Sequence, residues 1–232
     1  LDNASPDATA TIARSFRDPR IRIETNPTTL PQPDNWRRAV ELCRAPLVKL
    51  VCADDLLHPR CLELQVPPME NDGRLALVAS RRDMIDENSR LVVPRRGLKR
   101  LVGEHSGVDV ARRVVRSGTN PIGEPGGVLF RRDDYFAVGG WHPSRRWAMD
   151  LDLWVRLMQC GNFLGLSATL AAFRVGAHSL SAENEAMVYG VFSFAERGQS
   201  EKGLADTLEK AGLKVDRLEI SPEINSDVSL AV

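Results

Sequence analysis

The 232-residue sequence has no long apolar run, no excess of charge of either sign and no closely spaced pair of cysteines. Without a run of about 18 apolar residues, the chain is predicted to form no transmembrane helix. The formal net charge is zero, which argues against a dedicated nucleic-acid-binding protein, because such proteins carry a basic excess or a basic face. With 43% hydrophobic and 27% charged residues, the composition is that of an ordinary globular protein.

The cysteines also argue against a common kind of metal site. They are Cys43, Cys52, Cys61 and Cys160, and no two of them form a Cys-x-x-Cys pair. Structural zinc sites usually contain that pair, so we do not expect one here. We predict that the cysteines are reduced and mostly buried, as in a cytoplasmic protein.

What the sequence does contain is an alternation of apolar strands and amphipathic helices. Apolar runs at 47–53 and 75–80 predict buried strands of the kind found in parallel sheets. Asp34 is expected to cap a helix that buries Val40 and Cys43. This alternation indicates an α/β fold. The other predicted helices are at 8–16, 58–65, 108–115 and 150–159, and the other predicted strands are at 21–24, 128–132 and 168–175.

The character of the sequence changes near Ala195. Residues 197–203 are polar and contain glycine, as is typical of a linker. We therefore expect one domain at 1–194 and a C-terminal tail at 195–232 that holds one helix and one strand.

Two adjacent carboxylates, Asp54 and Asp55, directly follow the predicted strand at 47–53. Open α/β sheets bind ligands at the carboxyl ends of their strands. Adjacent carboxylates repel each other unless a cation or hydrogen-bond donors lie between them, and Mg²⁺ and Mn²⁺ prefer oxygen ligands. The pair fits a metal site, but an Asp-Asp turn before a helix accounts for the same two residues and is favoured when spacing alone is considered.

Three other segments carry candidate groups, each with a simpler alternative. Asp150 starts a predicted helix, where it would cap the helix or act as a general base. His178 follows the strand at 168–175, as a solvated loop residue or a metal ligand. Asp2 and Asn3 lie in a turn, where they would bind a nucleotide or only complete the turn.

Taken in order, these segments resemble motifs of the family 2 glycosyltransferases, which are inverting enzymes with the GT-A fold. The resemblance covers roughly residues 1–185. Five segments carry it: Asp2-Asn3-Ala4-Ser5-Pro6-Asp7, Asp34-Asn35-Trp36, the strand at 47–53 with Asp54-Asp55 and Pro59, Gly139-Gly140-Trp141 with Asp150-Leu151-Asp152-Leu153-Trp154-Val155-Arg156, and Phe173-Arg174-Val175 with His178, Ser179 and Ser181.

The resemblance implies an α/β domain of GT-A type (Rossmann-like), with a mixed, mostly parallel sheet flanked by helices. The family's first strand and the helix after it would precede Leu1. We therefore expect the domain to lack that strand and one wall of the nucleotide pocket.

The resemblance also assigns roles to individual residues. Asp150 would be the catalytic base that deprotonates the acceptor hydroxyl. Asp55 and His178 would bind Mn²⁺ or Mg²⁺. The residues that would bind the nucleotide sugar are Asp2, Asn3, Lys49 and Asp54.

The activity implied is a metal-dependent, inverting transfer of a sugar from a nucleotide-diphosphate sugar to a saccharide or lipid-linked acceptor. A UDP-sugar is the default donor, and residues 120–124 would lie near the acceptor. We expect a bacterial, cytoplasmic protein of polysaccharide biosynthesis, with peripheral membrane association and no nucleic-acid partner.

One residue departs from the family pattern. Met149 stands where the family carries a glutamate next to the base. This departure and the missing first strand favour an alternative, a non-catalytic glycosyltransferase-like binding domain, whereas the retained Asp54, Asp55, Asp150 and His178 favour an enzyme. A nucleotidyltransferase with a related core is a weaker hypothesis, because the sequence shows no Gly-rich loop that ends in Arg or Lys.

Overall fold

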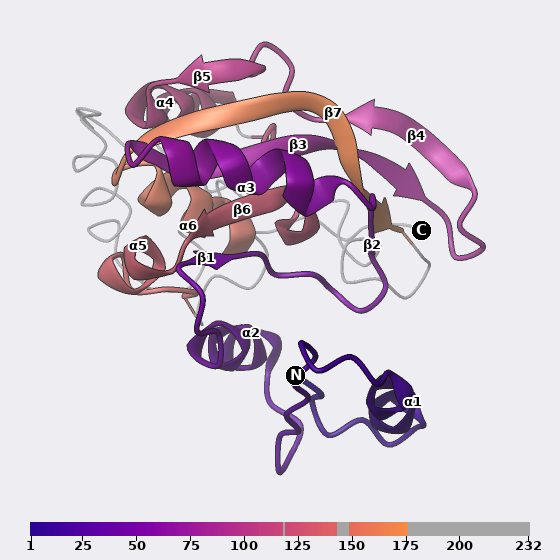
Figure 1. The fold of residues 1–232 in the computed structure, drawn as a ribbon. Helices are drawn as coiled ribbons and strands as arrows, with labels where there is room; N and C mark the ends of the chain where they lie inside the picture. The colour runs from indigo at the N-terminus through magenta and orange to yellow at the C-terminus, as the bar shows by residue number, and fades with distance from the viewer. Residues whose placement is uncertain (118, 143–148, 176–232) are drawn as a thin grey trace, which may run out of the picture. The chain divides into compact units, whose positions relative to one another are not determined.

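The computed structural model describes residues 1–117, 119–142 and 149–175 (Figure 1). The chain divides into two compact units, the first spanning Leu1–Arg44 and the second beginning at Ala45. The tail expected at 195–232 lies outside the described residues, so the boundary placed before it stays a prediction.

The first unit contains two helices, α1 (Thr9–Ser15) and α2 (Gln32–Glu41). α1 confirms the helix predicted at 8–16. α2 begins after Pro31, and Pro33 lies in its first turn, where a missing N–H removes no helical hydrogen bond. Asp34 therefore lies inside the first turn, and the prediction that it caps the helix is wrong.

The strand predicted at 21–24 does not form. In its place, a single parallel bridge joins Asp2 and Thr25. The N–H of Asp2 donates to the carbonyl of Glu24 over 2.8 Å, and the N–H of Asn26 donates to the carbonyl of Asp2 over 2.9 Å. The alternating pattern predicted a half-buried strand, but Ile21 is 48% exposed, so no packed layer covers the face on which it lies.

The second unit combines a sheet with helices. Its strands are β1 (Leu47–Val48), β2 (Leu56–Leu57), β3 (Leu75–Ile85), β4 (Leu91–Arg96), β5 (Gly103–His105), β6 (Val128–Arg131) and β7 (Asn162–Arg174). Its helices are α3 (Cys61–Asn71), α4 (Gly107–Ser117), α5 (Arg132–Ala137) and α6 (Met149–Leu157), with a short 3-10 helix η1 (Pro125–Gly127). This arrangement confirms the predicted α/β class with a mixed sheet flanked by helices (Figure 1).

Two long strands, β3 and β7, form the centre of the sheet. The strand order is β1-β6-β3-β7-β2, with β4 added to β3 and β5 added to β7. β3 and β7 run parallel, from Leu75 opposite Asn162 to Ile85 opposite Arg174, and the other pairs of named strands are antiparallel. The sheet was expected to be mostly parallel, and for the described strands that prediction is wrong. A continuous apolar run indicates that both faces of a strand are covered, but it does not indicate the direction of the neighbouring strands.

The central strands are covered on both faces. Val78 of β3 and Leu129 of β6 are register partners and pack with Met69 of α3. The next pair along the ladder, Leu77 and Phe130, points to the opposite face, because successive side chains of a strand alternate. α3 accordingly lies on one face of the sheet and α6 on the other (Figure 1).

An aromatic cluster fills the face that α6 covers. Phe130, Tyr135, Trp141 and Trp154 are each at most 1% exposed. The ring centroids of Trp141 and Trp154 lie 5.7 Å apart with the planes at 71°, an edge-to-face arrangement that aromatic rings favour. The cluster anchors α6, and with it the start of that helix, where Asp150 lies.

Several elements differ from the prediction in length or were not predicted. The strand expected at 47–53 shortens to β1, and β2, β4, β5 and α5 were missed. All six residues of β4 are exposed, its three apolar residues are consecutive and one residue is Pro94, so β4 lacks the alternating pattern that predicts a strand. α3 continues to Asn71 although it contains Pro67 and Pro68. Burial of Met69 in the core offsets the helical hydrogen bonds that the prolines remove. Among the described helices, none is long and apolar enough to cross a bilayer.

Gly165 of β7 provides a test of the packing between β7 and the segment before β5. A Cβ atom at position 165 would overlap the carbonyl oxygen of Leu101 and lie 2.9 Å from its carbonyl carbon. We expect Gly165→Ala to lower the free energy of unfolding by about 1–3 kcal/mol, because backbone must move to admit the methyl group. Urea unfolding followed by circular dichroism measures the change.

Gly73→Ala is the matched control, since no heavy atom lies within 4 Å of a Cβ atom at that position. Equal destabilisation by the two substitutions would contradict the close approach of β7 to Leu101.

Candidate active site

The Asp54–Asp55 pair lies in a turn between β1 and β2. The N–H of Asp55 donates to the carbonyl of Cys52 over 3.1 Å, which closes the turn. β2 begins at the next residue and pairs antiparallel with β7, with Leu56 opposite Ala172. Because the two strands run in opposite directions, the carboxylate pair before β2 lies beside the last residues of β7.

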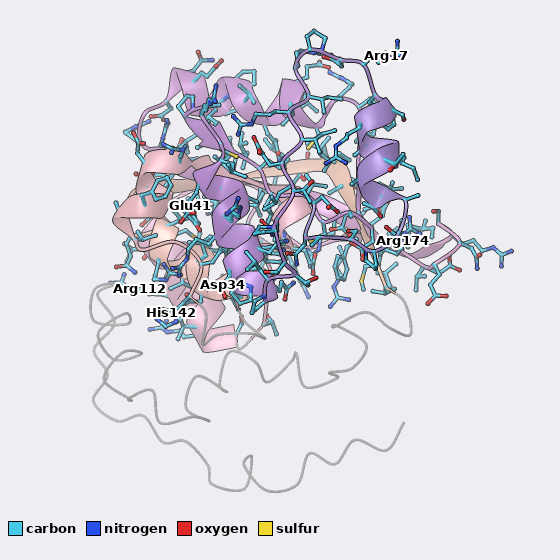
Figure 2. All side chains as sticks on the ribbon, turned by 90° about the horizontal axis from the view of Figure 1, so that it is seen from below. Arg17, Asp34, Glu41, Arg112, His142 and Arg174 are labelled. Atoms are coloured by element: carbon cyan, nitrogen blue, oxygen red, sulfur yellow. The ribbon has the colours of Figure 1, made fainter. Side chains whose placement is uncertain are left out.

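Arg174, labelled in Figure 2, is the last residue of β7 and holds this turn. Its backbone N–H donates to Oδ1 of Asp55 over 3.1 Å, and its Nε donates to the carbonyl of Asp54 over 2.9 Å. Its Nη1 donates to the carbonyls of Asp86 and Glu87, over 2.7 and 3.2 Å. Arg174 thus links the carboxylate pair to the turn between β3 and β4 and places a positive charge beside it.

The pair has the composition of a site for a hard divalent cation. Cys52, Asp54 and Asp55 each place one potential ligand atom within 4.8 Å of the other two. Burial, followed by the charges of Asp55 and Asp54, raises the pKa of the Cys52 thiol to about 12, so the thiol without a metal is protonated at neutral pH. Burial raises the pKa of Asp55 to about 6, which leaves it ionised at neutral pH. The two carboxylates are the kind of ligand that Mn²⁺ and Mg²⁺ prefer.

Lys49 lies on the stretch that leads from β1 to the pair. Its Nζ donates to the carbonyls of Gly126 and Val128, over 2.8 and 3.0 Å. Burial lowers the pKa of Lys49 to about 8. The ammonium group therefore ties this stretch to η1 and the start of β6, and its expected contact with a nucleotide sugar stays a prediction.

Asp150 occupies the first turn of α6, where two hydrogen bonds orient its carboxylate. Oδ1 accepts the N–H of Leu151 over 2.8 Å, and Oδ2 accepts a hydrogen bond from Nδ2 of Asn120 over 3.1 Å. Burial, followed by the charge of Glu124, raises the pKa of Asp150 to about 7, although Arg82 acts in the opposite direction. A carboxylate with a pKa near 7 can accept a proton at neutral pH, as a general base must.

The segment 120–124 lies against the start and middle of α6. Oδ1 of Asn120 accepts the N–H of Gly123 over 2.8 Å, which fixes the amide that donates to Asp150. Nε1 of Trp154 donates to the carbonyl of Gly123 over 2.9 Å. The segment therefore contacts the candidate base directly, whereas its expected place near the acceptor, implied by the resemblance, stays a prediction.

A buried ion pair joins β3 to this segment. Nη2 of Arg82 donates to Oε1 of Glu124 over 2.9 Å, and Nε of Arg82 contacts Oε2. The side chains are 3% and 14% exposed. Because a buried charge without a partner is strongly destabilising, each of the two residues requires the other.

Asp2 and Asn3 belong to the first unit and are engaged there. Asp2 is buried, and its Oδ1 accepts the N–H of Ser5 over 3.4 Å. Nδ2 of Asn3 donates to the carbonyl of Leu30, and its Oδ1 accepts from the N–H of Leu30 and from Nδ2 of Asn26, over 2.7–2.9 Å. These hydrogen bonds fit the simpler alternative given by the sequence, in which the two residues complete the turn. Nucleotide binding by either residue stays a prediction.

Two further positions complete the account of the predicted residues. His178 lies outside the described residues, so its expected role as a metal ligand stays a prediction. Met149 is 3% exposed, so its side chain packs in the core and contributes no polar group beside Asp150.

Sequence reasoning missed the part played by Arg82 and gave no individual role to Asn120 or Glu124. The only sequence signal for Arg82 was its place just after the buried run at 75–80, and the structure shows that it is itself 2% exposed. A charge that continues a buried strand needs a partner of opposite sign. No rule of spacing identifies that partner, because Glu124 lies 42 residues further along the chain.

Comparison with known proteins gives one family, one protein of similar sequence and one solved structure of similar fold. Residues 1–138 match the family described as Glycosyl transferase family 2. The uncharacterized protein MT1568 of Mycobacterium tuberculosis (strain CDC 1551 / Oshkosh) is 29% identical over 163 residues, which make up 68% of this chain and 51% of that protein.

Among solved structures, the crystal structure of S. aureus TarS 1-349 is similar with a TM-score of 0.57 at 15% identity. The alignment covers 90% of this chain and 59% of that one. At this identity the likeness shows a shared fold. The chain spans 51% and 59% of the lengths of these two proteins.

Asp150 should make the stability of the protein depend on pH. Its pKa rises from an ordinary 3.8 to about 7 on folding, so the folded state loses stability as the pH rises from about 4 through 7. Asp150→Asn removes the titrating group. We expect the melting temperature of the variant, relative to that of the wild type, to be higher at pH 8 than at pH 5.

Thermal unfolding at the two pH values measures this difference. Asp109→Asn is the control, because the Asp109 side chain is 68% exposed in its ion pair with Arg112. A difference between Asp150→Asn and wild type that stays constant from pH 5 to pH 8 would rule out a raised pKa at Asp150.

Proposed function

Because the chain belongs to glycosyl transferase family 2, we propose that it is a metal-dependent, inverting glycosyltransferase. The donor is a nucleotide-diphosphate sugar, with UDP as the default nucleotide. The acceptor is a hydroxyl group of a saccharide or of a lipid-linked molecule. The cation is Mn²⁺ or Mg²⁺.

The observation that carries the proposal is the grouping of carboxylates around Cys52. Asp54 and Asp55 each place a potential ligand atom within 4.8 Å of that of Cys52, and the charge of Asp150 adds to theirs in raising the pKa of the Cys52 thiol. The carboxylate pair comes from the turn before β2, whereas Asp150 comes from the start of α6. Residues with the chemistry of a metal site and of a base therefore border one region of the second unit.

Asp54 and Asp55 would hold the cation, which supplies positive charge to the leaving diphosphate. Arg174 assists at the same place, because its backbone N–H and its Nε fix the turn on which both carboxylates lie. Its guanidinium group also reduces the repulsion between them.

Asp150 is the base in the proposed reaction. The acceptor oxygen attacks the anomeric carbon while the bond from that carbon to the phosphate oxygen breaks. The electron pair of the broken bond leaves with the nucleoside diphosphate, and the hydroxyl proton passes to Asp150. A single displacement inverts the configuration at the anomeric carbon. With a pKa of about 7, Asp150 is both deprotonated in a useful fraction of molecules and basic enough to take the proton.

A second candidate, a non-catalytic domain that binds a nucleotide sugar, is favoured by Met149. The family's neighbouring glutamate is replaced there by an apolar side chain that is 3% exposed. Such a domain would keep metal-dependent nucleotide binding and lack turnover, so the two candidates differ in a measurable property.

Binding of UDP should depend on the cation and on Asp55. We expect calorimetric titration to show that Asp55→Asn weakens Mn²⁺-dependent UDP binding by about tenfold or more, since even an outer-shell partner of a metal contributes that much. Asparagine keeps an oxygen that can accept the N–H of Arg174, so the turn should stay folded. Asp109→Asn should bind as the wild type does, and UDP binding that is equal with and without Mn²⁺ would contradict the metal site.

Turnover should depend on Asp150. With Mn²⁺ present, we expect UDP release from a panel of UDP-sugars, with kcat reduced about 10²- to 10⁴-fold in Asp150→Asn, the usual range for loss of a general base. UDP binding by that variant should be retained. A wild-type chain that binds UDP with Mn²⁺ but releases none from any donor would overturn the enzyme proposal in favour of the binding domain.

A further inference from the structure

The guanidinium group of Arg82 fits beside two glycines, where other residues would place a side chain. Arg82 is 2% exposed, and two glycines with positive φ, Gly97 and Gly123, border its guanidinium group. A Cβ atom on Gly123 would lie 2.9 Å from Nη1 of Arg82, and a Cβ atom on Gly97 would lie closer still. The local backbone is therefore shaped to admit one large buried cation.

The buried cation fixes the position of Glu124. Both carboxylate oxygens of Glu124 face the guanidinium group, one through the hydrogen bond from Nη2 and the other through the contact with Nε. A carboxylate held by two adjacent donors of a planar group has little freedom to rotate. Glu124 is therefore a fixed charge on the segment 120–124.

That segment connects Glu124 to the candidate base. Asn120 donates to Oδ2 of Asp150 and accepts the N–H of Gly123, the residue before Glu124. Trp154, one turn along α6 from Asp150, donates to the carbonyl of the same glycine. Two of these hydrogen bonds thus hold the chain that carries Glu124 against the helix that carries Asp150, and the third fixes the shape of the segment itself.

The charge of Glu124 acts on both halves of the site. It raises the pKa of Asp150 and, more weakly than burial does, that of Asp55. Arg82 also acts on the pKa of Asp150, in the opposite direction, and the charge of Asp150 acts on the Cys52 thiol. On α6 itself, Asp152 forms an ion pair with Arg156. Glu124 is the carboxylate that acts on the pKa of Asp150 from a neighbouring element.

We propose that Glu124, held by Arg82, is a positioning residue for the base: it supplies from the segment 120–124 the second carboxylate that position 149 does not carry. The proposal rests on the role of Asp150 in the proposed function. A negative charge beside Asp150 makes its carboxylate a stronger base, and the bond from Asn120 keeps Oδ2 of that carboxylate in a fixed direction. The replacement of the family's glutamate by Met149 is then compatible with catalysis.

The test compares Glu124→Gln with the double variant Arg82→Gln/Glu124→Gln. Glutamine keeps the volume of Glu124 and an oxygen that accepts from Arg82, but it has no charge. Carboxyl ¹³C NMR follows the titration of Asp150, whose signal is assigned by its loss in Asp150→Asn. We expect the titration midpoint of Asp150 to fall by about one pH unit in Glu124→Gln, because a like charge is removed while the positive charge of Arg82 remains.

The double variant should reverse only part of that fall, because the charge of Glu124 raises the pKa of Asp150 more than the charge of Arg82 lowers it. The acid limb of the pH profile of kcat should move in the same order, with Glu124→Gln shifted furthest to low pH. Asp109→Asn, in an exposed ion pair, should leave the midpoint and the limb unchanged.

Two outcomes separate this inference from the proposed function. If Glu124→Gln lowers the melting temperature but leaves the midpoint of Asp150 unchanged, Glu124 only stabilises the fold and the inference is overturned, whatever the activity. If the midpoint falls as expected but the wild type releases no UDP from any donor, the coupling of Glu124 to Asp150 stands and the enzymatic function fails.

Discussion

The parallel pairing of β3 with β7 determines where the candidate groups of the second unit lie. The far end of β7 carries Arg174, which holds the turn with Asp54 and Asp55. β3 carries Arg82, which holds Glu124 and thereby the segment that bonds to Asp150. The metal-type pair and the base thus depend on two arginines from adjacent strands. A change in the register of this one pair would move both groups at once.

The sequence predicted the elements with strong patterns and missed those without one. The apolar run at 75–80 and the amphipathic stretch at 108–115 became β3 and α4, because burial alone specifies them. β4 has only exposed residues, so its sequence lacks the alternation of apolar and polar residues that predicts a strand. The strand at 47–53 was overestimated for the opposite reason. Its apolar residues continue past β1, where Lys49 bonds to carbonyls of η1 and β6 with its side chain.

The sequence predicted which residues belong to the candidate site, but it did not predict how those residues contact one another. The motifs pointed to Asp55 and Asp150 because a resemblance transfers residue types at matching positions. It could not show that Asn120 orients Asp150, or that Glu124 is paired with Arg82, because these contacts join residues 30 and 42 positions apart. Such contacts depend on tertiary packing, in particular on the aromatic cluster that anchors α6, and a single sequence does not reveal them. For the same reason, burial of Met149 became visible only in the folded chain.

The hydrogen bond between Arg174 and Asp55 also bears on how that carboxylate would hold an ion. Oδ1 of Asp55 accepts the N–H of Arg174, and Oδ2 lies 3.6 Å from the place where a Cβ atom on Gly126 would stand. Each carboxylate oxygen has more than one lone pair, so the N–H bond orients the group without using up its capacity for a cation. Mg²⁺ and Mn²⁺ commonly take six ligands, so two aspartates would leave most of the coordination sphere to water and to phosphate oxygens. An ion that arrives with a diphosphate would therefore find at this turn a pair of preoriented ligands and not a complete cage.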